Sequence, residues 1–329
     1  MLPKEYNPMK TFSLSIYRIQ IYKRLKKEEV VILSDYDNGK SFLDQCDAMF
    51  HSWKADPNNI LYKDAEAEKV SRMQKDAHGN EIYYKHANCI DGIIESGDYG
   101  TQEDIVNIDT GAYQYTKKLH DATLLPFYFM IYVIPNSTEG YLIVERIGTL
   151  GISSFLKTAI ANFIAPQLTD HYTLSIEPYV VPQILKIRLD EIGGAKKVRL
   201  RGVNTDQFKD LKTEQNFGEC KIEVVFAAHR NKIIPDILQV IRNLKRARES
   251  HESIRVNNIE CIDVAFELDI NGKSRTVTIA DMKNIGMNLD ITQQAELGPT
   301  NYPTYKCLSR EAHTILSYLM EENGVHGQV

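Results

Sequence analysis

The feature that most constrains the fold of this chain is a pair of apolar segments joined by a short polar link. Residues 126–134 read PFYFMIYVI, and residues 141–147 read YLIVERI after the link PNSTEG. Apolar runs of aromatic and β-branched residues bounded by turn residues are typical of β-strands. Because the link is too short for a crossover connection, the two strands should form an antiparallel hairpin.

A glycine-containing turn and a helix follow this hairpin. Gly148 and Gly151 precede residues 152–165, where apolar residues recur at the spacing of an amphipathic helix. A strand, a glycine turn and a helix can bind phosphate through backbone N–H groups. The sequence has neither Gly-x-Gly-x-x-Gly nor Gly-x-x-x-x-Gly-Lys-Ser/Thr, and Lys157 lies inside the helix. The glycines are therefore interpreted as turn residues, with a phosphate contact at the helix start as the alternative.

The rest of the chain alternates between short strands and helices. The other expected elements are strands at 11–22, near 82–96 and 104–108, at 172–180, 196–203 and 220–228, helices at 39–53, 233–248 and 309–322, and a hairpin at 261–279. Ser309 is the candidate N-cap of the last helix. Because residues 204–219 are polar, we predict two domains, 1–205 and 206–329. The fold class is α+β, with mostly antiparallel sheets and packed helices.

Charge and cysteine content limit the functional classes. The formal net charge is −5, so a nucleic-acid surface would have to be a local patch. The five cysteines include no Cys-x-x-Cys pair, which favours reduced thiols in a cytosolic protein. His86 and Cys89 are the nearest approach to a metal motif, but two ligands do not make a site.

The chain start lacks an apolar signal core, and no stretch is long enough to span a bilayer. We expect a cytoplasmic protein with no cofactor, no bound metal and no membrane insertion.

Basic residues gather in separate clusters. In the strand at 196–203, Lys197, Arg199 and Arg201 fall on one face by the two-residue period of a strand. The helix at 233–248 ends in RNLKRAR. Like charges at this spacing repel one another, so they add little to the stability of the fold. A third group lies at residues 23–27. The candidate DNA-binding residues are Lys196, Lys197, Arg199, Arg201, Arg230, Lys232, Arg242, Lys245, Arg246 and Arg248. We expect these cations to be exposed, and a merely solvated face is the alternative interpretation.

No catalytic group of residues stands out. Glu219 and Lys221 have the Glu-x-Lys spacing of some metal-dependent nucleases, without an identifiable aspartate partner. Asp263, Glu267 and Asp269 fall on one strand face, which suits either a metal site or an exposed edge strand. No Gly-x-Ser-x-Gly sequence marks a nucleophile. We predict no catalytic residues. A metal-dependent nuclease and an interaction protein without a nucleic-acid role remain the alternatives.

The order of elements over residues 120–322 resembles that of the RexA family of prophage-encoded exclusion proteins. The resemblance includes LPFYFMIYV, GYLIVERIG, SSFLKTAIANFI and LSIEP, then CKIEVVF with its basic helix, IDVAFELDINGKSRTVTI, and the last helix. It implies a dimeric α+β protein that binds duplex DNA without sequence specificity and acts as a sensor in phage defence. A membrane protein encoded alongside would be its partner. The soluble DNA-binding subunit of the Kiwa defence system is a second candidate relative.

The apolar hairpin and the helices also suggest self-association. They offer more hydrophobic strand surface than one small domain easily covers, so we expect a symmetric homodimer. Two subunits would double each basic patch and let a DNA duplex lie across both.

Overall fold

The computed structural model describes residues 10–36, 39–53, 61–168, 171–179, 181, 195–201, 203, 223–229, 254–256, 259–261, 263–270, 273–278 and 288–322. The chain forms two compact units, one of residues 1–179 with 288–329 and one of residues 180–287. This division differs from the boundary expected between residues 205 and 206. We refer to the two parts as the first and the second unit.

The first unit contains both ends of the chain because its main sheet recruits a strand from beyond the second unit. The chain leaves this sheet after β12 (Tyr172–Pro178) and returns with β19 (Asn288–Asp290). Both strands pair with β1 (Phe12–Lys23), β19 along Ser13–Ser15 and β12 along Tyr17–Lys23. A polar stretch in the sequence could not reveal this return, because strand pairing is set by contacts distant along the chain.

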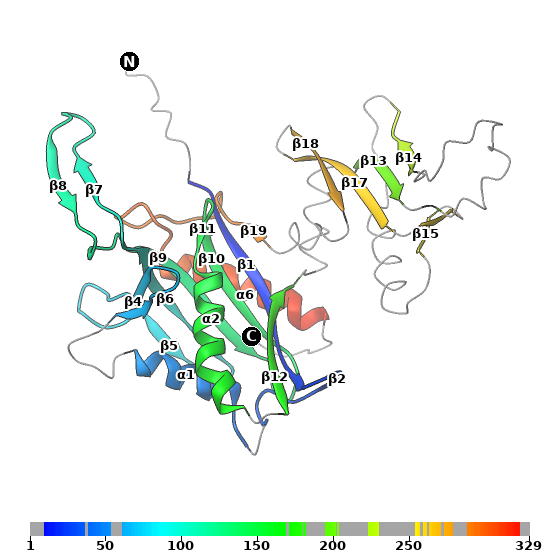
Figure 1. Cartoon of the computed structure of the whole chain (residues 1–329), viewed down its shortest axis with the longest axis horizontal. Coiled ribbons are helices and arrows are strands. Elements are labelled where there is room, and N and C mark those ends of the chain that lie inside the picture. Colours follow the sequence, from blue (N-terminus) through cyan, green and yellow to red (C-terminus); the bar gives the residue numbers. More distant parts are fainter. Residues whose placement is uncertain are drawn as a thin grey trace. The chain divides into compact units, whose positions relative to one another are not determined.

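Antiparallel pairing builds the main sheet. Its path runs through β12, β1, β10 (Gly140–Ile147), β9 (Leu125–Val133), β6 (Cys89–Asp98), β4 (Lys69–Met73) and β3 (Tyr62–Asp64). The short strands paired beside this path are β19 and β2 (Lys26–Val30) on β1, β11 (Leu150–Gly151) on β10, and β5 (Tyr83–Lys85) on β6. The expected hairpin is confirmed as β9 and β10, which lie in the middle of the sheet (Figure 1).

The apolar character of this hairpin follows from its central position. All residues from Phe127 to Ile131 and from Tyr141 to Val144 are buried. The strands are therefore covered within one chain, and the apolar surface that suggested self-association is not available there. Burial of aromatic and branched side chains at this density is the main hydrophobic contribution to the first unit.

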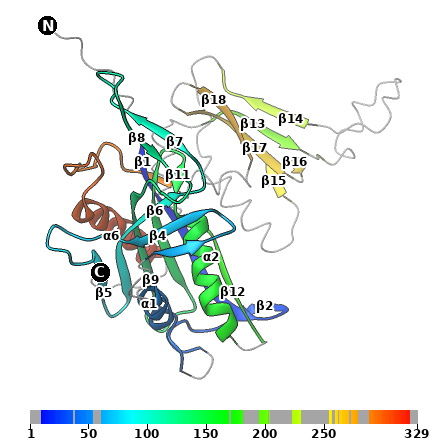
Figure 2. The same ribbon diagram turned by 60° about the vertical axis from the view of Figure 1, so that its left-hand side comes forward.

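Helices cover both faces of the sheet and give the first unit three layers. Tyr128 and Phe129 are neighbours in β9, so their side chains point to opposite faces. The Phe129 ring lies 4.9 Å from Phe50 of α1 (Phe42–Ser52), and the Tyr128 ring lies 6.0 Å from Tyr305 of α6 (Tyr305–Glu322). The helix α2 (Ser153–Ile164), extended by the short helix η1 (Ala165–Gln167), lies on the α1 side, where Phe155 contacts Trp53. Figures 1 and 2 show α2 and α6 on opposite sides of the sheet.

The last helix begins earlier than the sequence suggested. It starts at Tyr305, and the Thr304 hydroxyl accepts a hydrogen bond from the backbone N–H of Cys307 at 3.3 Å, as an N-cap does. The prediction that Ser309 caps this helix is wrong. Ser309 lies inside the second turn, and its hydroxyl points toward a buried aspartate on the sheet.

The glycine turn after β10 is a tight connection between two strands. Ile147 pairs with Leu150, and Gly148 between them has a φ of +61°, a backbone conformation that glycine adopts without strain. The helix α2 starts after this turn with no side chain capping its first N–H groups. The interpretation of Gly148 as a turn residue is confirmed.

A separate two-stranded hairpin projects from the first unit. It is formed by β7 (Glu103–Val106) and β8 (Tyr113–Lys117), and Figures 1 and 2 show it extending away from the main sheet. Every residue of β7 is exposed. Exposed large apolar side chains on and beside this hairpin are Ile105, Val106, Ile108, Tyr113, Tyr115 and Leu119.

The second unit contains a smaller antiparallel sheet. Its strand order is β14 (Glu223–Ala227), β13 (Ala195–Arg201), β17 (Asp263–Ile270) and β18 (Lys273–Thr278). A further pair is formed by β15 (Ile254–Val256) and β16 (Ile259–Cys261). The expected hairpin at 261–279 is confirmed as β17 and β18. The helix expected at 233–248 lies outside the described residues.

The α+β class and the antiparallel character of the sheets are both confirmed. Every strand pair in the described part of the chain is antiparallel. None of the described helices is long and apolar enough to cross a membrane.

Candidate functional site

The basic stripe predicted in the second unit forms on one face of β13. Val198 and Leu200 on the other face are buried, at 4% and 0% exposure. Lys197, Arg199 and Arg201 therefore share the opposite face, as the strand period requires. Lys196 next to them is exposed.

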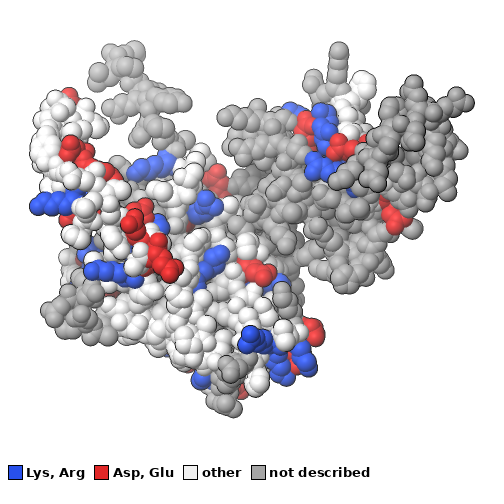
Figure 3. Space-filling view, in the orientation of Figure 1, with Lys and Arg blue, Asp and Glu red and all other residues white. Residues whose placement is uncertain are grey.

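Carboxylates from both neighbouring strands pair with this stripe. Glu267 of β17 lies 3.1 Å from the Lys197 ammonium and 3.3 Å from the Arg199 guanidinium. Glu223 of β14 lies 3.4 Å from Arg199 and 3.1 Å from Arg201. Three cations and two anions thus alternate across the sheet surface. In Figure 3, blue and red side chains lie side by side in the described part of the second unit.

The ion pairs add to the expectation that these cations are exposed: Arg201 is exposed, Lys197 and Arg199 are half-buried, and all three are paired with carboxylates. The Arg199 side chain retains 28% exposure, and its Nε atom is buried without a hydrogen-bond partner. The carboxylates were missed because they lie 22 to 70 residues away in sequence and meet the stripe only through strand pairing. A phosphate would have to compete with Glu223 and Glu267 for these cations, which lowers the expected contribution of the stripe to DNA binding.

The other predicted DNA-binding residues cannot be placed in the fold. Arg230, Lys232, Arg242, Lys245, Arg246 and Arg248 lie outside the described residues. Their role remains a prediction from the sequence.

The two units carry net charge of opposite sign. Residues 180–287 contain 19 Lys and Arg against 15 Asp and Glu, a formal charge of +4. The rest of the chain contains 20 Lys and Arg against 29 Asp and Glu, a formal charge of −9. The overall charge of −5 is therefore the sum of a basic second unit and an acidic first unit. This signal was present in the sequence, but it becomes visible only when the charges are counted within the limits of the folded units.

The first unit has a buried polar cluster between the sheet and α6. The Asp91 side chain on β6 is 1% exposed, and its Oδ2 atom accepts hydrogen bonds from the hydroxyls of Tyr128 and Tyr305 at 2.9 and 2.8 Å. The Ser309 hydroxyl lies 3.4 Å from the same oxygen. Burial, reinforced by Asp91, raises the pKa values of both tyrosines above the usual range. The cluster therefore fixes α6 to the sheet through donors that stay protonated.

A second buried carboxyl group lies beside this cluster. Glu145 on β10 is 2% exposed, and its Oε2 atom accepts a hydrogen bond from the backbone N–H of Tyr128 at 2.9 Å. Its Oε1 atom has no hydrogen-bond partner among the described residues. Burial raises the pKa of Glu145 from its ordinary value of 4.5 to about 8, because a charge in an apolar interior loses its hydration. Sequence reasoning missed both Asp91 and Glu145, because nothing in the local sequence distinguishes a buried carboxyl group from an exposed one.

Metal-binding groups are dispersed in the described part of the chain. Those residues contain no group of three or more His, Cys, Asp and Glu side chains suited to hold a metal ion. Cys46, Cys89, Cys261 and Cys307 are buried free thiols, and burial raises the pKa of Cys89 to about 11. Of the carboxylates considered for a metal site, Glu267 is held by two cations. Glu219 and Lys221 lie outside the described residues.

Comparison with known proteins does not assign the chain to a family. No protein-family model matches the sequence, and no curated protein matches it significantly.

Proposed function

We propose that this chain is a non-enzymatic, DNA-binding component of a bacterial anti-phage exclusion system. The observation that supports DNA binding best is the charge division, with a basic unit of +4 inside a chain of −5. A polyanion is attracted to a local positive unit even when the whole molecule is acidic, because salt screens charges beyond about 10 Å. The resemblance to the RexA family supports the role in defence. On the same basis, we propose a cytoplasmic location and a membrane protein encoded alongside as a partner.

Within the second unit, we assign the larger share of phosphate binding to the sequence RNLKRAR and its neighbours. Arg242, Lys245 and Arg246 recur at helical spacing, and the carboxylates nearest to them in sequence are Asp236, Glu249 and Glu252. The β13 stripe makes a smaller contribution because Glu223 and Glu267 already neutralise much of it. Backbone contacts of this kind give affinity with little sequence preference.

Incubation with supercoiled plasmid in the presence of Mg²⁺ or Mn²⁺ tests this proposal against its alternatives. A mobility shift without cleavage supports a DNA-binding protein, whereas nicking would support a metal-dependent nuclease. Absence of both effects would favour an interaction protein without a nucleic-acid role.

Neutralising a carboxylate that pairs with the β13 stripe should increase DNA affinity. Glu223→Gln removes the anion that pairs with Arg199 and Arg201, so both cations become available to phosphate. We expect the dissociation constant for a duplex at about 0.1 M salt to fall about two- to fivefold. This factor corresponds to the free energy that a surface ion pair contributes. Glu66→Gln, an exposed carboxylate of the first unit, is the control with the same change of charge. Equal affinities for the two variants would exclude the stripe from the DNA interface.

Self-association is the second part of the proposal, and the β7–β8 hairpin is its best surface. Six large apolar side chains are exposed on and beside this projecting hairpin, whereas the central strands are buried. Exposed apolar surface on this scale marks interaction sites in soluble proteins. The backbone edges of a two-stranded hairpin can also pair with an identical edge of a second copy.

Polar substitutions in the hairpin should therefore dissociate the dimer. Val106→Ser with Ile108→Ser removes two exposed apolar side chains without opening a cavity in the fold. We expect light scattering at micromolar concentration to give a dimer mass for the wild type and a monomer mass for this variant. Leu25→Ser with Leu297→Ser makes the same change at exposed positions elsewhere and should stay dimeric. A monomeric wild type would contradict self-association, and a dimeric hairpin variant would place the interface elsewhere.

A further inference from the structure

A cavity of about 400 Å³ opens at the edge of the main sheet in the first unit. The strands β4 and β5 pair with successive parts of β6, and the chain between them forms a turn whose arms meet at Lys75 and Glu81. Phe50 and Trp53, at the end of α1, line the cavity opposite this turn. Its volume lies within the range of small-molecule sites, which is about 300–1,000 Å³.

One side of the cavity is aromatic and apolar. Phe50, Trp53 and Met73 line it, and the Trp53 ring lies 5.1 Å from Phe50. The Trp53 ring also lies 5.0 Å from Tyr62, so neighbouring rings fix its position. Flat apolar walls of this kind suit a planar ring, because stacked aromatic groups contact over a large area.

The indole of Trp53 carries a donor that is not used within the protein. Trp53 is 7% exposed, and its Nε1 atom is buried with no hydrogen-bond partner among the described residues. An unsatisfied buried donor costs about 1–3 kcal/mol, and buried polar groups in folded proteins usually have partners. Because the nitrogen is covered by protein atoms, a ligand in the cavity contacts carbon atoms of the ring and not this donor.

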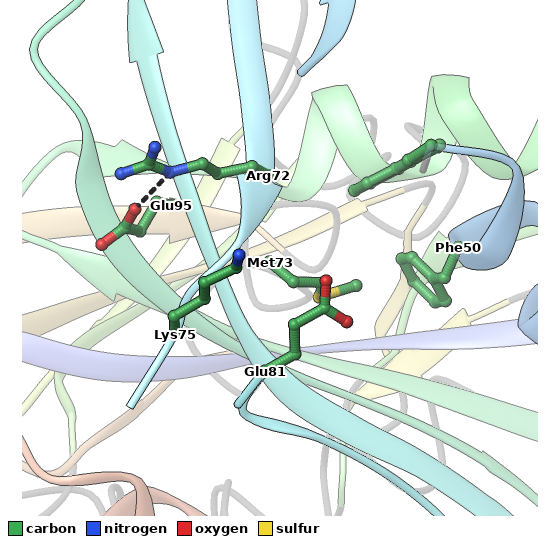
Figure 4. A pocket seen from close by; sticks show the side chains of 7 residues that line it. Phe50, Arg72, Met73, Lys75, Glu81 and Glu95 are labelled. Carbon is green, nitrogen blue, oxygen red and sulfur yellow. Dashed lines mark hydrogen bonds and ion pairs between the residues drawn. The ribbon is translucent and has the colours of Figure 1, made fainter. Parts of the chain in front are cut away.

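The charged side of the cavity leaves one cation available. Glu95 accepts from Arg72 at 2.8 Å and from Gln74 at 3.3 Å, so Arg72 is engaged. Figure 4 shows this ion pair as a dashed line, with Lys75 and Glu81 extending side by side from the two arms of the turn. Glu81 also has a partner of its own. Lys75 has no ion pair or hydrogen bond from its side chain to any described residue, so its ammonium is free to bind an anion.

We propose that this cavity binds a small organic anion that has a planar apolar ring and an acidic group such as a carboxylate, sulfonate or phosphate. The ring lies against Phe50, Trp53 and Met73, and the acidic group accepts from Lys75. This site belongs to the first unit and is independent of DNA binding by the second.

Trp53 is the single tryptophan of the chain, so one indole N–H resonance reports on the cavity. The probes are 1-naphthalenesulfonate and the neutral 1-naphthalenesulfonamide, which share a ring and differ in charge. We expect the sulfonate to shift the indole resonance of the ¹⁵N-labelled full-length chain saturably. Lys75→Met should raise the sulfonate dissociation constant about tenfold, which corresponds to 1.4 kcal/mol, and leave the weaker sulfonamide binding unchanged.

The controls separate charge from general loss of structure. Lys75 is exposed, so Lys75→Met should fold like the wild type, and an unchanged amide spectrum checks this. Lys63→Met, at an exposed lysine outside the cavity, should bind the sulfonate as the wild type does. Absence of an indole shift at millimolar sulfonate would overturn the proposal. An equal dissociation constant for wild type and Lys75→Met would overturn it as well.

Discussion

Replacing Asp91 by alanine is expected to lower the free energy of unfolding by about 3 kcal/mol or more. The Asp91 Oδ2 atom accepts hydrogen bonds from Tyr128 and Tyr305, and both hydroxyls lose their acceptor when the side chain is removed. Each buried donor left unsatisfied costs about 1–3 kcal/mol, and the shortened side chain leaves a cavity in addition. Urea denaturation of wild type and variant measures the difference.

The control for this variant lies at the end of the same strand. Asp98→Ala removes an exposed carboxylate whose partner is the surface residue Lys69, at 2.7 Å. Such surface pairs contribute about 0–1 kcal/mol, so this variant should remain close to wild type. Because the lost bonds hold α6, its amides should also exchange with deuterium faster in Asp91→Ala. Equal stability of Asp91→Ala and Asp98→Ala would show that the buried cluster does not hold α6 to the sheet.

Glu145→Gln is expected to stabilise the protein above neutral pH and to leave it nearly unchanged near pH 4.5. In the folded protein, burial raises the pKa of Glu145 from 4.5 to about 8. Between these values the folded state holds a proton that the unfolded state has released, so the stability contributed by this group falls as pH rises. A shift of this size corresponds to up to about 5 kcal/mol, at 1.36 kcal/mol for each pH unit. Glutamine keeps the oxygen that accepts from Tyr128 and removes the titration.

The measurement is the difference in unfolding free energy between Glu145→Gln and wild type from pH 4.5 to pH 8.5. We expect this difference to grow with pH and to level off above about pH 8. Glu66→Gln, at an exposed position, supplies the baseline for removing one carboxylate. If Glu145→Gln shows a pH-independent difference, or a loss of stability at pH 8, Glu145 is not a buried group with a raised pKa.

The elements with strong local patterns were predictable from the sequence. The strands β9 and β10 and the helix α2 lie within about two residues of the expected bounds, because a long apolar run or a helical stripe leaves few alternative structures. The turn at Gly148 was predictable for a similar reason, since few residues tolerate its positive φ.

Structural features that depend on contacts between residues far apart in the sequence were not predictable in the same way. The return of β19 to β1 places the C-terminal helix in the first unit, and only the pairing of Leu14 with Leu289 and their neighbours reveals it. The carboxylates that pair with Arg199 lie on two other strands. Asp91 and Glu145 lie in β6 and β10, which also carry Glu95, Asp98 and Arg146, and nothing local distinguishes a buried carboxyl group from an exposed one. The start of α6 was missed because Ser309 and Thr304 both suit an N-cap, and Thr304 has this role.

The measurement that tests the central claim most directly is the salt dependence of duplex DNA affinity in two matched triple variants. One variant combines Arg242→Ala, Lys245→Ala and Arg246→Ala in the second unit. The other combines Lys63→Ala, Lys118→Ala and Lys306→Ala at exposed positions of the first unit. Both lose three positive charges, so a difference between them reports on where DNA binds.

We predict that two unrelated duplexes bind the wild type with affinities that agree within about threefold and fall steeply with salt. The slope of log affinity against log salt should decrease by about three in the second-unit variant and by less than one in the first-unit variant. Equal slopes for the two variants, or no salt-dependent binding by the wild type, would contradict DNA binding through the basic unit.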